Sequence, residues 1–199
     1  MLYTYRIEQA IRAATILHKD QVRKGDAPIP YISHLFSVAL ITSEYAPVED
    51  LVITALLHDT LEDTDYTAEE LQDDFGGEVR VMVETLSEPQ SSGEIEYSWQ
   101  DRKNHYLKKL KEAPEEVLIV AAADKIHNLR SIVEDYYENH QQFLADFGNT
   151  HDKRINFYEK LSELLNERLS NPIINEFNNV FAEYKKFIHD IEKSRETEF

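Results

Sequence analysis

The fold is decided by residues 51–64, which read LVITALLHDTLEDT. The first seven residues are apolar except for one threonine, and a helix that is apolar all round must lie inside the protein. His58 and Asp59 follow directly. Two adjacent polar groups on a buried helix need partners, because burying an unpaired polar group is costly. The stretch therefore predicts a buried central helix over residues 51–61 that carries a polar site.

The same change from apolar to ligand-type residues occurs on two other predicted helices. Residues 117–123 are apolar and lead directly to Asp124, and His34 lies on a helix predicted over residues 31–44. One buried histidine is more often structural, but three such helices together favour a metal site. Imidazole and carboxylate ligands suit Mn, Fe, Zn or Ni. The chain has no cysteine, so thiolate ligands are excluded.

An acidic pair follows the central polar site. Glu62 and Asp63 lie one helical turn beyond His58 and Asp59, so the four side chains should project toward one place. Two histidines and two aspartates would balance the charge of a divalent cation and leave coordination positions for water and a substrate oxygen. The acidic pair could then orient that water and carry its proton. This arrangement suits hydrolysis at phosphorus.

Helical spacing of apolar residues recurs along nearly the whole chain. Gly and Pro are scarce, at 5 and 6 of 199 residues, which also favours helices joined by short loops. Further helices are predicted over residues 5–19, 67–75, 78–86, 99–111, 114–133 and 152–169, with a last one starting at Pro172. Strand stays open as an alternative for residues 78–86. We expect an all-α bundle with a core in residues 1–134, and additional helices in residues 135–199 that pack on it within the same domain.

The charge of the chain limits its partners. There are 21 basic and 38 acidic residues, a net charge of −17, which argues against binding a nucleic acid polymer. An anionic small substrate would need local cations. No run approaches the roughly 20 apolar residues that span a bilayer, and residues 1–12 lack a signal-peptide pattern. We therefore expect a cytoplasmic protein without a membrane partner; a homo-oligomer is compatible with the sequence.

Several segments resemble the hydrolase domains of the RelA/SpoT homologues, which belong to the HD-domain superfamily. The order His34, His58-Asp59, Asp124 is the metal-ligand pattern of that superfamily. The matching segments are QVRKG at 21–25, PYISH at 30–34, ALLHDTLEDT at 55–64, FG at 75–76 and ADKIHNLR at 123–130. Those domains use Mn²⁺ to remove the 3′-diphosphate from the alarmone ppGpp, which yields GDP and pyrophosphate.

The resemblance covers about residues 5–133 and implies an all-helical HD fold with a specific assignment of roles. The implied Mn²⁺ ligands are His34, His58, Asp59 and Asp124. The implied catalytic acidic pair is Glu62 and Asp63. The implied contacts with an anionic nucleotide substrate are Arg23, Lys24 and Asn128.

The sequence also departs from the long members of that family. At 199 residues it has no room for their synthetase and regulatory domains, so it is closer to the small, stand-alone alarmone hydrolases. A Thr-Lys pair of the long enzymes is replaced by TLSEP at 85–89, which removes one basic contact. Residues 99–106 resemble an HD subgroup of unassigned substrate, and Arg102 and Lys103 are expected on a surface helix. The alternatives are an HD nucleotidase or phosphohydrolase of other specificity, and a non-catalytic nucleotide-binding module.

Overall fold

The computed structural model describes residues 2–25, 28–89, 91–92, 95–137, 139–148 and 151–197. Within these ranges the regular structure is helical, except for two short antiparallel strands, β1 (Ser91–Ser92) and β2 (Ile95–Glu96). The helices are α1 (Tyr5–Leu17), α2 (Ile32–Tyr45), α3 (Glu49–Leu57), α4 (Thr60–Asp63), α5 (Ala68–Phe75), α6 (Gly77–Leu86), α7 (Trp99–Glu112), α8 (Glu115–Tyr136), α9 (His140–Phe147), α10 (His151–Arg168) and α11 (Ile173–Thr197). The predicted all-α fold is confirmed.

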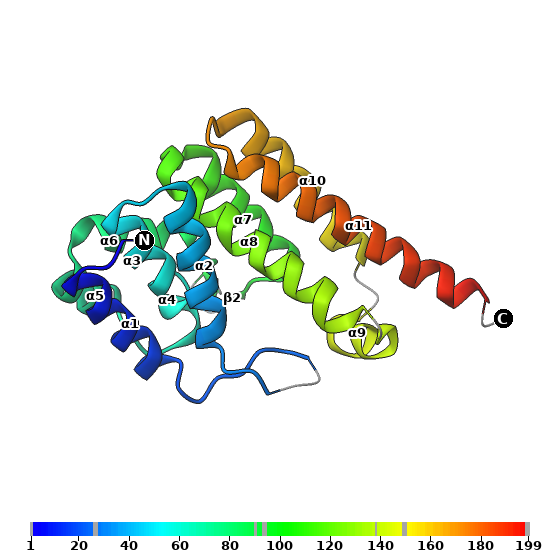
Figure 1. Cartoon of the computed structure of the whole chain (residues 1–199), viewed down its shortest axis with the longest axis horizontal. Coiled ribbons are helices and arrows are strands. Elements are labelled where there is room, and N and C mark those ends of the chain that lie inside the picture. The colour runs from blue at the N-terminus through cyan, green and yellow to red at the C-terminus, as the bar shows by residue number, and fades with distance from the viewer. Residues whose placement is uncertain are drawn as a thin grey trace.

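Helix α8 is the centre of the fold. Its residues 117–126 are all buried, which is why this part of the helix has no polar face apart from Asp124 and Lys125. Helices α2, α3 and α6 pack against α8, and α11 packs along it. In Figure 1, α1 to α6 gather at one end of the molecule, while α11 extends beside α8 toward the other end. Asp124 is thereby placed where α8 meets α2 and α3.

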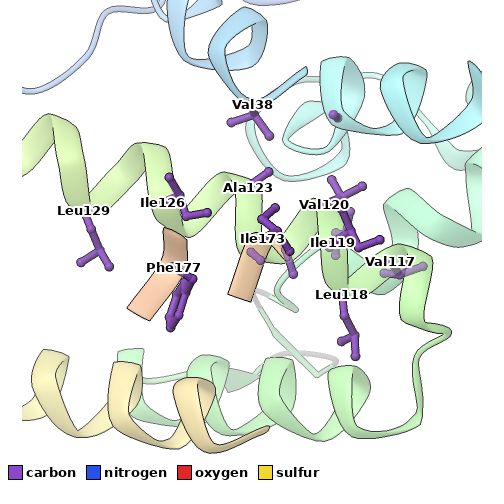
Figure 2. Packing of buried hydrophobic residues seen from close by; sticks show 14 of the residues in the cluster. Val38, Val117, Leu118, Ile119, Val120, Ala123, Ile126, Leu129, Ile173 and Phe177 are labelled. Atoms are coloured by element: carbon purple, nitrogen blue, oxygen red, sulfur yellow. The ribbon is translucent and has the colours of Figure 1, made fainter. Parts of the chain in front are cut away.

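Side chains of α8 fill the core on more than one side. Figure 2 shows Val120 and Ala123 of α8 pointing toward Val38 of α2, whereas Leu118 points the opposite way. Phe177 of α11 belongs to the same buried cluster and is fully buried. Removing a buried phenylalanine side chain from such a core costs about 3–5 kcal/mol. The packing of α11 therefore stabilises the helix that carries Asp124.

The predicted helix over residues 51–61 is wrong in one respect, because it breaks between Leu57 and Thr60. Nδ1 of His58 bonds the carbonyl oxygen of Ala55 at 2.8 Å, and Oγ1 of Thr60 donates to the carbonyl oxygen of Leu57 at 2.6 Å. These side chains engage carbonyls that a continuing helix would use. The short helix α4 then begins, and the amides of Glu62 and Asp63 both donate to the carbonyl of Asp59. The acidic pair thus lies on a separate turn.

Local signals account for the ends of the neighbouring helices. Thr67 and Glu70 form the predicted capping box at the start of α5. Gly76 has φ +94°, a conformation that favours glycine, and it separates α5 from α6. The strand alternative for residues 78–86 is wrong, since α6 covers them. Helix α8 also runs to Tyr136, beyond the predicted end at residue 133.

The C-terminal helices pack on the rest of the chain. Helix α11 contacts α8 and α10, and its residues Phe177, Tyr184 and Ile188 belong to the same core cluster as α2 and α3. The assignment of residues 135–199 to the same domain as residues 1–134 stays a prediction. In the ranges given above, no helix is both long enough and apolar enough to cross a membrane. A cytoplasmic location and a homo-oligomer also stay predictions.

Candidate metal centre and adjoining pocket

The four side chains predicted as metal ligands converge from three parts of the chain. His34 comes from α2, His58 and Asp59 from the turn after α3, and Asp124 from α8. Nε2 of His34 lies 3.3 Å from Oδ1 of Asp124 and 3.6 Å from Oδ2 of Asp59. Nε2 of His58 lies 3.3 Å from Oδ2 of Asp59 and 3.7 Å from Oδ1 of Asp124. Donors about 2.1 Å from one cation lie about 3 Å apart, a spacing that these pairs approach. The ligand atoms of His34, His58 and Asp59 all lie within 4.8 Å of one another, which suits one ion, and Oδ1 of Asp124 lies beside both histidines.

Hydrogen bonds orient both histidine rings. Nδ1 of His58 lies 2.8 Å from the carbonyl oxygen of Ala55. A carbonyl can only accept, so Nδ1 of His58 carries the proton and Nε2 faces the two aspartates. Nδ1 of His34 lies 2.8 Å from Nδ1 of His127, which leaves Nε2 of His34 directed at the same point. Fixing a ring through its other nitrogen is typical of histidines that bind metals.

The surroundings of His58 favour a cation. Its Nε2 atom is buried and has no hydrogen-bond partner among the residues that the structure describes. Burial lowers the pKa of His58, but the charges of Asp59 and Asp124 outweigh burial and raise it to about 9. The site therefore favours a positive charge at Nε2, which a proton or a metal ion can supply. Two imidazole nitrogens and two carboxylate oxygens form a donor set that suits a divalent transition metal.

Polar neighbours hold both aspartates in place. The hydroxyl of Tyr31 donates to Oδ2 of Asp59 at 2.6 Å. The amide of Asn128 donates to Oδ1 of Asp124, and Nζ of Lys125 donates to Oδ2 of the same residue, both at 2.5 Å. Burial raises the pKa of Asp124, but the charge of Lys125 and the two histidines lower it well below its usual range. Both carboxylates are thus held in the ionised form that metal binding needs.

The predicted acidic pair, Glu62 and Asp63, directly follows the predicted ligands His58 and Asp59 but does not line the basic cavity described below. Oε1 of Glu62 accepts a hydrogen bond from the backbone amide of Glu88 at 2.6 Å. Burial and the charge of Asp59 raise the pKa of Glu62 to about 7 in the metal-free protein. The pKa of Asp63 is raised by the same two causes. Both side chains line an open groove with Asp20 and Gln21.

A second cavity, of about 370 Å³, adjoins the ligands on another side. Tyr31 and Asn128 line it; Tyr31 also bonds Asp59 and Asn128 also bonds Asp124, the two aspartates predicted as metal ligands. Nη2 of Arg23 donates to Oδ1 of Asn128 at 3.1 Å, which fixes this guanidinium at the cavity wall. Five basic side chains line the cavity: Arg23, Lys24, Lys103, Lys125 and Arg154. In a chain with a net charge of −17, such a cluster marks a place for an anion.

Sequence reasoning missed three of these basic residues. Lys103 was expected on the surface, but it lies largely buried beside Glu88, with Nζ 5.1 Å from the ring centre of Phe157. Lys125 could have been suspected, because a lysine stands directly after Asp124 in an apolar helix. Arg154 stacks over Phe147 at 4.7 Å, and its buried Nε has no acceptor in the described ranges. Nothing in the local sequence around Arg154 indicated this position.

The helical fold together with this cluster of two histidines and two aspartates defines the class of HD-domain proteins. The chain belongs to the HD-domain family, whose model, described as "HD domain", matches residues 10–148. A mouse relative, guanosine-3′,5′-bis(diphosphate) 3′-pyrophosphohydrolase MESH1, is 32% identical over 165 residues, which cover 76% of this chain and 88% of the mouse protein. The resemblance to the RelA/SpoT homologues is thereby confirmed.

Other relatives agree in name or in fold. The guanosine-3′,5′-bis(diphosphate) 3′-pyrophosphohydrolase of Aquifex aeolicus is 35% identical over 63% of this chain, a match that covers 18% of the Aquifex protein. A metazoan SpoT orthologue whose structure is described as that of a ppGpp hydrolase has a TM-score of 0.75, covering 92% of this chain and 97% of that one. At 22% identity this likeness shows the fold alone. A Listeria monocytogenes protein matches with a TM-score of 0.62 and 28% identity, covering 81% of this chain and 97% of that one.

Proposed function

We propose that this protein is a Mn²⁺-dependent hydrolase that removes the 3′-diphosphate from ppGpp, releasing GDP and pyrophosphate. The observation that carries the proposal is the convergence of His34, His58, Asp59 and Asp124 beside a cavity lined by five basic side chains. The mouse and Aquifex relatives are named for this reaction. A nucleotide with many phosphate charges needs both the metal site and the basic cavity. The basic side chains would hold part of the nucleotide while the 3′-diphosphate reacts at the metal site.

The same four side chains would hold the ion. A metal ion would displace the proton from Nε2 of His58, which no hydrogen-bond partner in the described residues holds in place. The carboxylates of Asp59 and Asp124 are ionised and can donate electron pairs to the same ion. A bound divalent ion would polarise a phosphate oxygen and promote the ionisation of water near neutral pH. Mn²⁺ is our first choice among the divalent ions, since mixed nitrogen and oxygen ligands accept it.

Glu62 and Asp63 would manage the proton of the attacking water. Both follow Asp59 by one helical turn, so they lie beside the reacting centre without being ligands. Burial raises the pKa of Glu62, which makes its carboxylate a better proton acceptor than an exposed glutamate. Glu62 is held in place by the amide of Glu88, which suits a base that must point in one direction. We assign Glu62 as the principal base and Asp63 as its helper.

The basic cavity would bind the nucleotide. Arg23, Lys24, Asn128 and Arg154 line the cavity, and Lys24 and Arg154 both lie over the ring of Phe147. Lys125 also lines it and bonds Asp124, one of the proposed metal ligands. Lys125 is thus suited to bind the phosphate that is attacked, while Arg154 and Lys24 neutralise more distant phosphates. Trp99 and Phe147 line the same cavity, and Arg154 lies over both rings, so these aromatic side chains hold in place the cation that would meet the nucleotide.

The test is hydrolysis of ppGpp by protein that has been treated with a chelator and then supplied with Mn²⁺. The expected products are GDP and pyrophosphate in equal amounts, with no activity before the metal is added. A parallel panel of nucleoside mono-, di- and triphosphates is assayed for inorganic phosphate. Release of phosphate from that panel, with ppGpp left intact, would overturn the alarmone assignment in favour of another HD phosphohydrolase. No hydrolysis of any nucleotide despite Mn²⁺ binding would leave a nucleotide-binding module.

A further inference from the structure

His18 is a buried histidine that the proposed mechanism does not use. It caps the C-terminus of α1, where its backbone amide donates to the carbonyl of Ala14, and its side chain is 1% exposed. Residues 18–21 lead from α1 into the loop that carries Arg23 and Lys24. Two separate contacts connect this one imidazole to the metal centre and to the acidic pair.

The first contact runs through the face of the ring. The imidazole of His18 stacks on Tyr31, with ring centres 5.4 Å apart and an interplanar angle of 22°. The hydroxyl of Tyr31 donates to Oδ2 of Asp59, the oxygen that lies nearest to Nε2 of His58. Because Tyr31 lies against His18, the direction of its hydroxyl is limited. The stack therefore helps to set the rotamer of a proposed metal ligand.

The second contact runs through the edge of the ring. Nδ1 of His18 lies 2.7 Å from Oε1 of Gln21, and Nε2 of Gln21 donates to the carbonyl oxygen of Asp63 at 2.6 Å. Since the amide nitrogen of Gln21 faces a carbonyl, its oxygen must face His18, and Nδ1 of His18 must carry a proton. The carbonyl of Gln21 also accepts from the amide of Tyr31 at 2.9 Å. This chain of bonds supports the turn that carries Glu62 and Asp63.

We propose that His18 is a positioning residue that aligns the metal ligand Asp59 through Tyr31 and the acidic pair through Gln21, an inference that rests on the proposed function. The hydroxyl of Tyr31 bonds a proposed ligand directly, and loss of such a bond changes metal affinity by about 10–100-fold. His18 acts one residue further out, so we expect the lower end of that range. A displacement of about 1 Å at a reacting group can cost about 100-fold in rate. If His18 only filled space at the end of α1, its substitution would not change the metal affinity without the rate, or the rate without the metal affinity.

Two substitutions separate the two contacts. His18→Phe keeps a flat ring for the stack on Tyr31 but removes the bond to Gln21. His18→Asn keeps a donor close to the position of Nδ1 but removes the ring. The matched control is His105→Phe, because His105 is an exposed histidine that stacks on Tyr97 and whose Nδ1 bonds the carbonyl of Asp101, far from the ligands in sequence.

The two variants should show opposite patterns. For His18→Asn, electron paramagnetic resonance titration should give a Mn²⁺ affinity about tenfold weaker than that of the wild type, with kcat at saturating Mn²⁺ within about threefold. For His18→Phe, the Mn²⁺ affinity should stay within about twofold, while kcat for ppGpp falls about tenfold at unchanged KM. His105→Phe should change neither quantity. If the His18 variants do not fold, two other variants break the next bond on each route. Tyr31→Phe keeps the stack but removes the bond to Asp59, and Gln21→Met removes the bonds that join His18 to the carbonyl of Asp63, so they should give the same two patterns.

Equal values for both variants and the wild type would overturn the inference. The inference would also be overturned if both variants lost Mn²⁺ affinity and kcat to the same extent and in proportion to a fall in their melting temperatures. Mn²⁺ titration needs no substrate, so failure of the wild type to hydrolyse ppGpp would refute the proposed substrate and leave the affinity comparison to decide the role of the stack. Failure of the wild type to bind Mn²⁺ would refute the proposed metal centre and this inference together.

Discussion

Nζ of Lys125 donates a hydrogen bond to Oδ2 of Asp124 at 2.5 Å, and both side chains are buried. The ammonium also lies 5.0 Å from the ring centre of Tyr106. Asp124 offers its other oxygen to His34, so one carboxylate connects a fixed cation to the proposed metal centre. Lys125 therefore neutralises Asp124 and also lines the basic cavity.

We expect Lys125→Met to weaken both stability and activity. Methionine keeps an apolar stem beside Tyr106 but leaves the buried charge of Asp124 without its cation. Breaking one partner of a buried pair costs about 3 kcal/mol, so metal-free protein should unfold at a lower urea concentration. The kcat/KM for ppGpp should fall at least about 100-fold, because a positive charge near the developing phosphate charge is lost. Lys108→Met, at an exposed position of α7, is the control. An unchanged urea midpoint would contradict the prediction.

Glu62→Gln should remove most of the hydrolysis without changing metal binding. A positioned general base contributes about 10²–10⁴ to the rate, and the amide of glutamine cannot accept the proton. We expect kcat to fall by that factor, KM to change less than about threefold, and Mn²⁺ affinity to stay close to the wild-type value. Asp63→Asn should have a smaller effect on kcat, and Glu69→Gln on the exposed side of α5 should have none. Activity retained by Glu62→Gln would assign the proton transfer elsewhere.

Binding of Mn²⁺ should stabilise the fold through the four converging side chains. A ligand at a concentration 100 times its Kd stabilises the folded state by about 2.7 kcal/mol. For a chain of this size that corresponds to a rise in Tm of about 5–10 °C. The rise should be measured by differential scanning calorimetry after chelation and addition of Mn²⁺. His58→Asn should abolish it, and an equal rise in that variant would place the ion elsewhere.

Arg154→Met should impair substrate binding more than catalysis. The guanidinium lies over Phe147 and carries a buried Nε without an acceptor among the described residues, so a substrate phosphate is its expected partner. A hydrogen bond to a charged group contributes about 1.5–3 kcal/mol, which corresponds to a rise in KM of roughly tenfold or more. The kcat should stay within about threefold of the wild type. Arg12→Met, on the exposed face of α1, is the control. A fall in kcat at constant KM would refute this role.

Glu176 should make the attachment of α11 sensitive to pH. Its carboxylate accepts hydrogen bonds from Tyr45 of α2 and Arg130 of α8. Partial burial raises the pKa of Glu176, but these bonds and the charge of Arg130 outweigh it and lower the pKa below 4.5. A lowered pKa in the folded state means that the stabilisation is present above about pH 4.5 and is lost as the pH falls through the folded-state pKa.

The measurement is the free energy of unfolding of the wild type and Glu176→Gln at several pH values. At pH 7 the variant should be less stable by about 1 kcal/mol, a modest value because Arg130 is partly exposed. The difference should shrink as the pH is lowered below 4.5. Glu183→Gln, at an exposed position of the same helix, should be equal to the wild type at pH 7. A difference that stayed constant down to pH 3 would exclude the ionised pair as its cause.

The spacing of apolar residues predicted most of the helices, because the buried face of a helix needs apolar side chains at regular positions along the sequence. The apolar run before Asp124 and the capping box at Thr67 both describe local requirements that α8 and α5 meet. The break after Leu57 was missed, because His58 and Thr60 compete for backbone carbonyls through their side chains. Apolar spacing alone contains no sign of that competition.

The sequence by itself determined that the protein is helical and that imidazole and carboxylate groups stand where its core helices would otherwise be apolar. It also predicted the family, since His34, His58-Asp59 and Asp124 stand in the order of the metal-ligand pattern of HD domains. Only the tertiary structure decided which basic groups join them: Lys103 and Arg154 come from α7 and α10, and their charges reach the cavity because α10 packs against α8 and α7 packs against α10. The spacing of apolar residues is set by burial within a single helix. The convergence of side chains on one cavity depends on how helices distant in sequence pack together, and no short stretch of sequence contains that information.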